Sequence, residues 1–234
     1  MVPPSDALLR PHDTTAQVLD EVPLPCAMLF ATNGYAREAG MKAAPKAPKQ
    51  ISLICGLGNP GPEYAETRHN AGFATVDLLA ERAGVRYWKS QAGCDVARIG
   101  WTSAGEAREV VLAKPQSYMN TSGGPLSKLM RELRVGPQEV LVVHDEVDLP
   151  QGQVRAKFGG GLNAHNGLRS VADKLGTRDF ARLRFGVGRP PGKMSVADYA
   201  LRQLKGGFLD ELRLTAQDAA DLAERCLDGN VSWD

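Results

Sequence analysis

The segment ISLICGLGNPG, residues 51–61, contains the first strongly patterned element of the chain and indicates its fold class. Residues 51–57 form a nearly continuous apolar run that ends at a glycine, which is typical of a β-strand buried on both faces of its sheet. Strands of this kind occur in parallel sheets that are covered by helices on both sides. The expected fold therefore belongs to the α/β class.

The rest of the chain alternates between strand-like and helix-like segments. Helical spacing of apolar residues occurs in 70–83, 120–134, 166–175 and 209–226. Strand patterns occupy 94–101, 109–113, 139–147, 154–158 and 182–187. This alternation predicts a single α/β domain, with a twisted, mostly parallel or mixed β-sheet flanked by α-helices on both faces. We assign the domain to residues 50–234.

Residues 1–49 differ in composition from the rest of the chain. They contain scattered Pro, Ala and Lys residues without a sustained period of 3.6 or 2, and they end in the linker-like segment KAAPKAPKQ. A segment of this kind lacks the apolar pattern that is needed to bury one face. We expect it to be a disordered or loosely packed N-terminal extension.

The composition limits the classes of protein that fit. The chain has 234 residues, of which 43% are hydrophobic and 24% charged, and its formal net charge is +1. A chain this long buries a core without disulfides or metals, and any nucleic-acid surface must be a local basic patch. The four cysteines form no C-x-x-C pair, so we expect no zinc site. No apolar run reaches the roughly 18 residues of a membrane span, and we expect a cytoplasmic protein without membrane contact.

Gly56, Gly58 and Gly61 match the G-x-G-x-x-G pattern of dinucleotide-binding loops. That mechanism requires the third glycine to begin a helix whose N-terminus faces the pyrophosphate. Here prolines flank the third glycine and the helical pattern starts only near residue 70, so we expect no nucleotide cofactor. Instead, we expect Gly56 and Gly58 to allow a sharp turn that displays Asn59 at the carboxyl edge of the sheet.

Polar side chains gather in four separate segments, each at the end of an expected strand or the start of an expected helix. These segments supply Asn59, Tyr64, His69 and Asn70; Met119 and Asn120; His144, Asp145 and Asp148; and Lys157, His165 and Asn166. Because such positions lie at one edge of an open α/β sheet, we expect the segments to converge on one site. Their Asn, His and Asp residues suit a site that hydrogen-bonds an amide-rich ligand and moves a proton.

Several of these residues also have a purely structural interpretation. Asn120, or the neighbouring Thr121, is placed to cap the following helix. His144 lies within a strand pattern and is interpreted as a packed core histidine, and Asp148 is placed to hold the following turn. The spacing alone leaves both interpretations of Asn120 open.

Four blocks resemble bacterial peptidyl-tRNA hydrolases, in the same order and with similar spacing. The blocks are GLGNPGPEYAETRHNAG (56–72), KPQSYMNTSG (114–123), VVHDEVDLP (142–150) and HNG (165–167). The resemblance extends from about residue 50 to the C-terminus. It implies a single-domain α/β monomer, without metal or cofactor, that hydrolyses the ester between a peptide and the 3′ end of tRNA after abortive translation. The implied partner is therefore peptidyl-tRNA.

The same resemblance implies roles for individual residues. The catalytic histidine corresponds to His69, and the aspartate that holds it corresponds to Asp145. Residues that bind the peptidyl part or the 3′ end correspond to Asn59, Tyr64, Met119, Asn120, His165 and Asn166, and we add the neighbouring Asn70 to this set. Basic residues that face the tRNA correspond to Lys157 and Arg184, and we expect help from Arg155, Arg169, Lys174 and Arg182.

The chemistry agrees with these roles. Histidine has a usual pKa of about 6.5, so its neutral form accepts a proton from water at neutral pH. A carboxylate on the other ring nitrogen fixes the tautomer and stabilises the imidazolium that forms. No serine or cysteine nucleophile is apparent beside His69, which favours direct attack by water. We expect Asn120 or Asn70 to donate to the developing oxyanion.

The glycine-rich segment GGGLNAHNG, residues 159–167, departs from the family pattern. The family usually has glycine where this chain has Ala164, and small residues or histidine where it has Leu162. The Cβ of Ala164 adds mild strain if its φ is positive. The departure affects the peptide site and His165 but not the catalytic pair.

Two other functions are compatible with such a sequence. Some organellar relatives are non-catalytic RNA-binding partners in splicing, and this hypothesis predicts a transit peptide. Residues 1–49 lack the Arg- and Ser-rich bias of a transit peptide. The second alternative is a hydrolase for another ester or a small amide.

Overall fold

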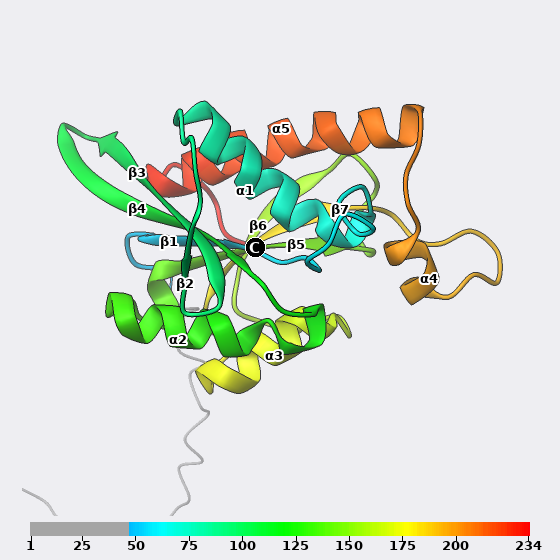
Figure 1. Ribbon diagram of the computed structural model, residues 1–234, viewed down its shortest axis with the longest axis horizontal. Helices are drawn as coiled ribbons and strands as arrows, with labels where there is room; N and C mark the ends of the chain where they lie inside the picture. Colours follow the sequence, from blue (N-terminus) through cyan, green and yellow to red (C-terminus); the bar gives the residue numbers. More distant parts are fainter. Residues whose placement is uncertain (1–46) are drawn as a thin grey trace, which may run out of the picture. The chain divides into compact units, whose positions relative to one another are not determined.

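The computed structural model describes residues 47–234. These residues form one seven-stranded mixed sheet with helices on both faces (Figure 1). The predicted α/β fold class is therefore confirmed. The predicted extension, residues 1–49, falls almost entirely outside the described residues and stays a prediction.

The sheet is parallel at its centre and antiparallel toward both edges. Its strands are β1 (Leu53–Gly56), β2 (Lys89–Gln91), β3 (Cys94–Ser103), β4 (Glu106–Pro115), β5 (Val140–Glu146), β6 (Val154–Phe158) and β7 (Ala181–Gly186). They follow the order β2-β3-β4-β1-β5-β7-β6. β1 pairs in parallel with β4 and β5, and β5 with β7, while β2, β3 and β6 add antiparallel pairs. The apolar runs of β1 and β5 are buried along their whole length, as their sequences predict.

Two helical layers cover the sheet. The helices are α1 (Ala71–Arg82), α2 (Gly123–Leu133), α3 (Asn166–Leu175), α4 (Val196–Leu201) and α5 (Gly207–Leu227), with short 3-10 turns at η1 (Arg68–Asn70), η2 (Met119–Thr121) and η3 (Pro137–Glu139). α1 and α5 cover one face, and α2 and α3 cover the other (Figure 1). Alternate strand residues feed two cores: Ile54 and Val143 pack on the α1–α5 side, and Leu53 and Val142 on the α2–α3 side. No helix in residues 47–234 has the length and apolarity to cross a membrane.

The helix predicted over 120–134 begins at Gly123, and its predicted cap is wrong. Residues before it form the 3-10 turn η2, and the N-cap residue Ser122 makes no side-chain capping bond. Thr121 Oγ1 donates to the carbonyl of Tyr118 at 2.9 Å. Asn120 is exposed and its side chain makes no hydrogen bond to any described residue, so its amide is left for another role.

Gly56 and Gly58 serve close packing rather than the sharp turn that we expected. Neither has a positive φ. A Cβ on Gly56 would lie 2.3 Å from the carbonyl oxygen of Gly72, and one on Gly58 would lie 2.7 Å from the ring of Phe73. These glycines allow α1 to lie directly against the end of β1. They thereby bring η1, which carries His69, to the carboxyl edge of the sheet.

Candidate active site

A cavity of about 700 Å³ opens at the carboxyl ends of β1 and β5. The loop after β1, the turn η2, the end of β5, the loop before α3, and α4 form its walls. The sequence-predicted residues that line it are Asn59, Tyr64, His69, Met119, Asn120, Asp145, Asp148, His165 and Asn166. Asn70, Lys157 and Arg184 lie outside this lining. The structure thus brings together side chains from all four polar segments.

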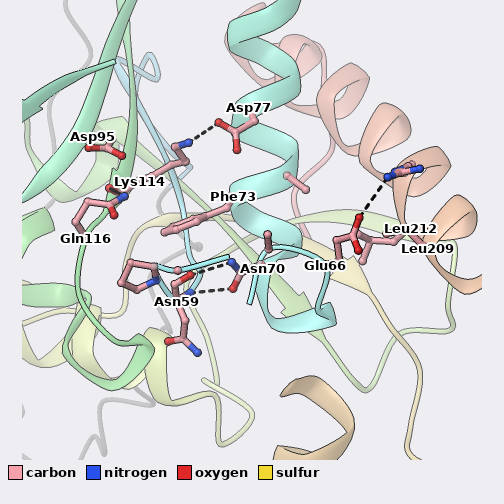
Figure 2. A pocket seen from close by; sticks show the side chains of 15 residues that line it. Asn59, Glu66, Asn70, Phe73, Asp77, Asp95, Lys114, Gln116, Leu209 and Leu212 are labelled. Carbon is pink, nitrogen blue, oxygen red and sulfur yellow. Dashed lines mark hydrogen bonds and ion pairs between the residues drawn. The ribbon is translucent and has the colours of Figure 1, made fainter. Parts of the chain in front are cut away.

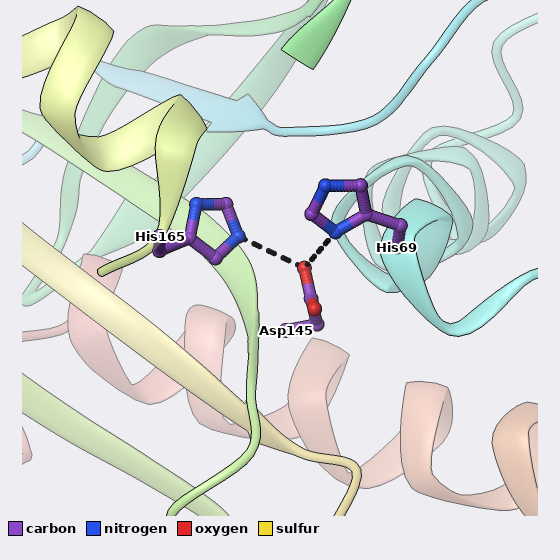
Figure 3. A group of neighbouring side chains, drawn as sticks. All are labelled: His69, Asp145 and His165. Atoms are coloured by element: carbon purple, nitrogen blue, oxygen red, sulfur yellow. Dashed lines mark hydrogen bonds and ion pairs between the residues drawn. The ribbon is translucent and has the colours of Figure 1, made fainter. Parts of the chain in front are cut away.

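His69 and Asp145 form a direct hydrogen bond across the end of the sheet (Figure 3). His69 Nδ1 lies 2.9 Å from Asp145 Oδ1. The Asp145 side chain is only 4% exposed, whereas that of His69 is 17% exposed. Because the proton on Nδ1 points to the carboxylate, Nε2 of neutral His69 is left free to accept a proton.

The pKa values of the pair shift in opposite directions. Burial opposes ionisation of Asp145, but the two neighbouring histidines outweigh it and hold the pKa of this carboxyl well below its usual range. Burial also opposes protonation of His69, but the charge and hydrogen bond of Asp145 raise the pKa of His69 above its usual value. The carboxylate is therefore ionised at neutral pH, and it is placed to stabilise an imidazolium on His69.

His165 donates to the same oxygen of Asp145. Its Nε2 lies 2.9 Å from Asp145 Oδ1, and its Nδ1 accepts the N–H of Leu168 at 3.2 Å as the N-cap of α3. A ring nitrogen that accepts an amide proton carries none itself, so neutral His165 has its proton on Nε2. Asp145 Oδ1 therefore faces two N–H donors at once (Figure 3).

This tautomer weighs against a metal ion at the cluster. The candidate ligand atoms of His69, Asp145 and His165 lie within 4.8 Å of one another. A neutral His165 that bound a metal through Nε2 would carry its proton on Nδ1, where it would face the N–H of Leu168. The cluster is better suited to proton sharing than to metal coordination.

His144 lies beside this cluster as a core residue. It is 1% exposed, and its Nδ1 donates to the carbonyl of Asp145 at 2.8 Å. Burial and the neighbouring His165 hold the pKa of His144 well below its usual value, so it stays neutral at physiological pH. The sequence-based interpretation of His144 as a packed histidine is confirmed.

Asn70 holds the backbone of Asn59 (Figure 2). Its Oδ1 accepts the N–H of Asn59 and its Nδ2 donates to the carbonyl of Asn59, both at 2.9 Å. Asn70 is 3% exposed, and both ends of its amide are occupied. These contacts give the Asn70 amide a structural role, and its expected role in binding the substrate or the oxyanion stays a prediction. Asn59 Oδ1 accepts the N–H of Met119 at 2.8 Å, which leaves Asn59 Nδ2 as the available donor.

Four of the proposed RNA-binding cations lie on β6 and β7, where Arg155 faces Arg184 and Lys157 faces Arg182, and the other two, Arg169 and Lys174, lie on α3. Arg182 is 2% exposed and donates to the carbonyl of Gly161 at 2.7 Å, so the expectation that it extends a surface patch is wrong. Arg184 has a side chain that is 13% exposed, and its Nε lies 3.2 Å from a buried carboxylate oxygen of Glu146. Part of its charge is therefore balanced within the protein.

Some residues around the cavity were not anticipated from the sequence. α4 contributes an apolar wall of Val196, Ala197, Ala200 and Leu201, and no motif marks it. Asn163 lines the cavity and donates to Glu146. Ala164 has a φ of +59°, so the condition for mild strain at this position is met.

The fold and the site together define a class of protein. No serine, threonine or cysteine lines the cavity in the part of the chain that the structure describes. An α/β domain with a histidine–aspartate pair and free amides at its sheet edge is suited to a hydrolase in which water, rather than a side-chain nucleophile, attacks the substrate.

Comparison with known proteins specifies this class further. A family model described as peptidyl-tRNA hydrolase matches residues 53–232. A peptidyl-tRNA hydrolase from Frankia alni is 51% identical over 172 residues, which cover 74% of this chain and 85% of the relative. One from Nocardia farcinica is 48% identical over 179 residues, with coverages of 75% and 90%. The chain belongs to the peptidyl-tRNA hydrolase family.

A solved structure supports the same family at the level of the fold. The crystal structure of a mutant peptidyl-tRNA hydrolase from Acinetobacter baumannii superposes with a TM-score of 0.70 at 34% sequence identity. The match covers 79% of this chain and 92% of the other. The resemblance in the four sequence blocks is therefore matched by a resemblance in three dimensions.

Proposed function

We propose that the chain hydrolyses the ester bond of peptidyl-tRNA with a water molecule that His69 activates. The contact of 2.9 Å between His69 Nδ1 and Asp145 Oδ1 carries this proposal. It keeps the proton on Nδ1 and leaves Nε2 to take one from water. Family membership supports the choice of substrate.

The reaction balances with these groups alone. Water attacks the carbonyl carbon of the ester while His69 Nε2 takes its proton, and Asp145 stabilises the imidazolium. The tetrahedral intermediate then collapses, and the bond from the carbonyl carbon to the ribose oxygen breaks. His69 returns the proton to this leaving oxygen. The products are a free peptide and a tRNA with an intact 3′ hydroxyl group.

Free amides around the cavity support the binding part of the proposal. Asn120 lines the cavity and does not cap a helix, so its amide is our candidate for the donor to the oxyanion. Asn59 and Asn166 are our candidates for binding the peptide groups of the substrate, beside Tyr64, Met119 and His165. We also propose that the protein acts as a monomer in the cytoplasm.

Peptide release from an N-acetylated aminoacyl-tRNA tests the proposed function. We expect release well above the uncatalysed rate. We expect much slower hydrolysis of the same tRNA with a free α-amino group, because an ammonium group does not replace the lost amide contacts. Tight RNA binding without release would favour the non-catalytic RNA-binding alternative. Equal release from both substrates would favour an esterase of broader specificity.

Lys157, with the exposed Arg155 beside it and Arg184 across the strand pair, is our candidate for the electrostatic contact to tRNA. Log KM is expected to rise with log salt concentration between about 50 and 200 mM. Lys157→Ala is expected to raise KM and to reduce the slope by about 1. Lys89→Ala is the matched control, because β2 lies at the opposite edge of the sheet from β6. A KM independent of salt would contradict this contact.

A further inference from the structure

Glu146 is buried at the end of β5 and joins three segments of the chain. Only 4% of the surface of Glu146 is exposed to solvent. Its Oε2 accepts Asn163 Nδ2 at 2.9 Å and Arg184 Nε at 3.2 Å, and its Oε1 accepts the N–H of Asp148 at 3.1 Å. One carboxylate thus connects β5 and β7 to the loop that leads into α3.

The loop that Glu146 holds has a costly backbone conformation. Asn163 has a φ of +44° and Ala164 a φ of +59°, so two successive non-glycine residues lie in the left-handed region. Asparagine visits this region more readily than alanine, whose Cβ is crowded by the backbone there. The hydrogen bond from Asn163 to Glu146 holds this turn against its backbone cost. The turn directly precedes His165 and therefore sets the position of its ring.

We propose that Asn163 is a positioning residue that acts on the catalytic base through His165. The anchored turn places His165 Nε2 at 2.9 Å from Asp145 Oδ1, the same oxygen that binds His69 Nδ1. Loss of the hydrogen bond between Asn163 and Glu146 frees His165 to move away from Asp145. Asp145 Oδ1 then accepts a hydrogen bond from His69 alone. The inference rests on the proposed function, since it requires His69 to be the base.

Loss of the Asn163 anchor is expected to change how strongly Asp145 stabilises the imidazolium of His69. Besides Asp145, the charged or titratable side chains around His69 and His165 are Arg68, His144, Tyr64, Tyr118, Glu146, Asp148 and Arg189. In the described residues, only Asp145 is hydrogen-bonded to the ring of His69. A carboxylate oxygen with one N–H donor stabilises the imidazolium of His69 more strongly than one with two donors. Loss of the anchor is therefore expected to move the acid limb of the pH–rate profile to higher pH.

Two substitutions of Asn163 test this inference. Asn163→Ala removes the amide, and Asn163→Gly removes it while restoring freedom at positive φ. We expect kcat/KM at neutral pH to fall about tenfold in both, mainly through kcat. The acid limb of kcat/KM is expected to shift to higher pH in both. Urea unfolding of each variant shows that the measured protein is folded.

A double substitution separates positioning from a general loss of structure. His165→Ala alone is expected to shift the acid limb to higher pH, and Asn163→Ala added to it is expected to cause no further shift. An unchanged rate and acid limb in Asn163→Gly would overturn the inference, as would an equal shift from Asn163→Ala in both backgrounds. Full activity of His69→Ala would overturn the proposed function and this inference together. If His69→Ala is inactive but the acid limb of kcat/KM stays at the same pH in both Asn163 variants, this inference alone fails.

Discussion

His69→Ala is expected to lower kcat for peptide release by about 10²- to 10⁴-fold, the usual contribution of a positioned general base. Water without a base attacks the ester slowly, and in the described structure no other imidazole replaces His69. His144 is 1% exposed and stays neutral, and His165 directs its proton to Asp145. The measurement is single-turnover release of the peptide from N-acetylated aminoacyl-tRNA.

The KM and the folding of His69→Ala serve as the controls for this prediction. KM is expected to change little, because the proposed cations and amides are left in place. The variant is also expected to stay folded, since His69 lines the open cavity rather than either core and His165 still donates to Asp145 Oδ1. Equal release by the variant and the wild-type protein would refute the proposed base.

Asp145→Asn is expected to lower kcat by about 10- to 100-fold, a smaller loss than removal of the base. His69 and His165 both donate to Oδ1 of Asp145, so an asparagine oxygen in the same place accepts both bonds. The geometry and the tautomer of His69 therefore persist, while the charge that stabilises the imidazolium is lost. A loss as large as that of His69→Ala would instead show that the amide has rotated and changed the tautomer.

The same variant is expected to change the pH dependence in a definite direction. The rate requires neutral His69, so kcat/KM rises as the pH passes through the pKa of this histidine. Asp145 raises that pKa above its usual value, and removal of its charge lowers it again. The acid limb of Asp145→Asn is therefore expected at lower pH than that of the wild-type protein, with a lower plateau. A limb at unchanged pH would contradict the assignment of the limb to His69.

The buried strands and amphipathic helices were the predictable part of this fold. The helix expected over 166–175 has those bounds, and the strand expected over 154–158 is β6. β3 and β4 extend beyond the predicted 94–101 and 109–113, because the end of this hairpin is solvated. The paired residues beyond the predicted ranges at this end are mostly polar, namely Thr102, Ser103, Glu106 and Arg108, and show no apolar pattern. Backbone pairing continues there although the pattern ends.

The residue types of the site were also predictable, but their partners were not. A sequence shows that Asn70 is an amide near His69, yet not that both ends of the amide meet the backbone of Asn59. Arg182 and Lys157 are both cations on paired strands, and only the packing of the glycine-rich loop shows that one is buried. The role of His165 depends on the N–H of Leu168, which exists as a free donor because α3 begins there.

The most direct test of the central claim is a comparison of two pKa values in the same protein. One is the pKa of the His69 ring, followed by NMR, and the other is the pKa of the acid limb of kcat/KM for peptide release. The proposed mechanism predicts that the two agree, that both lie above about 6.5, and that both fall in Asp145→Asn. A His69 ring that titrates without a matching change in rate would contradict its role as the base.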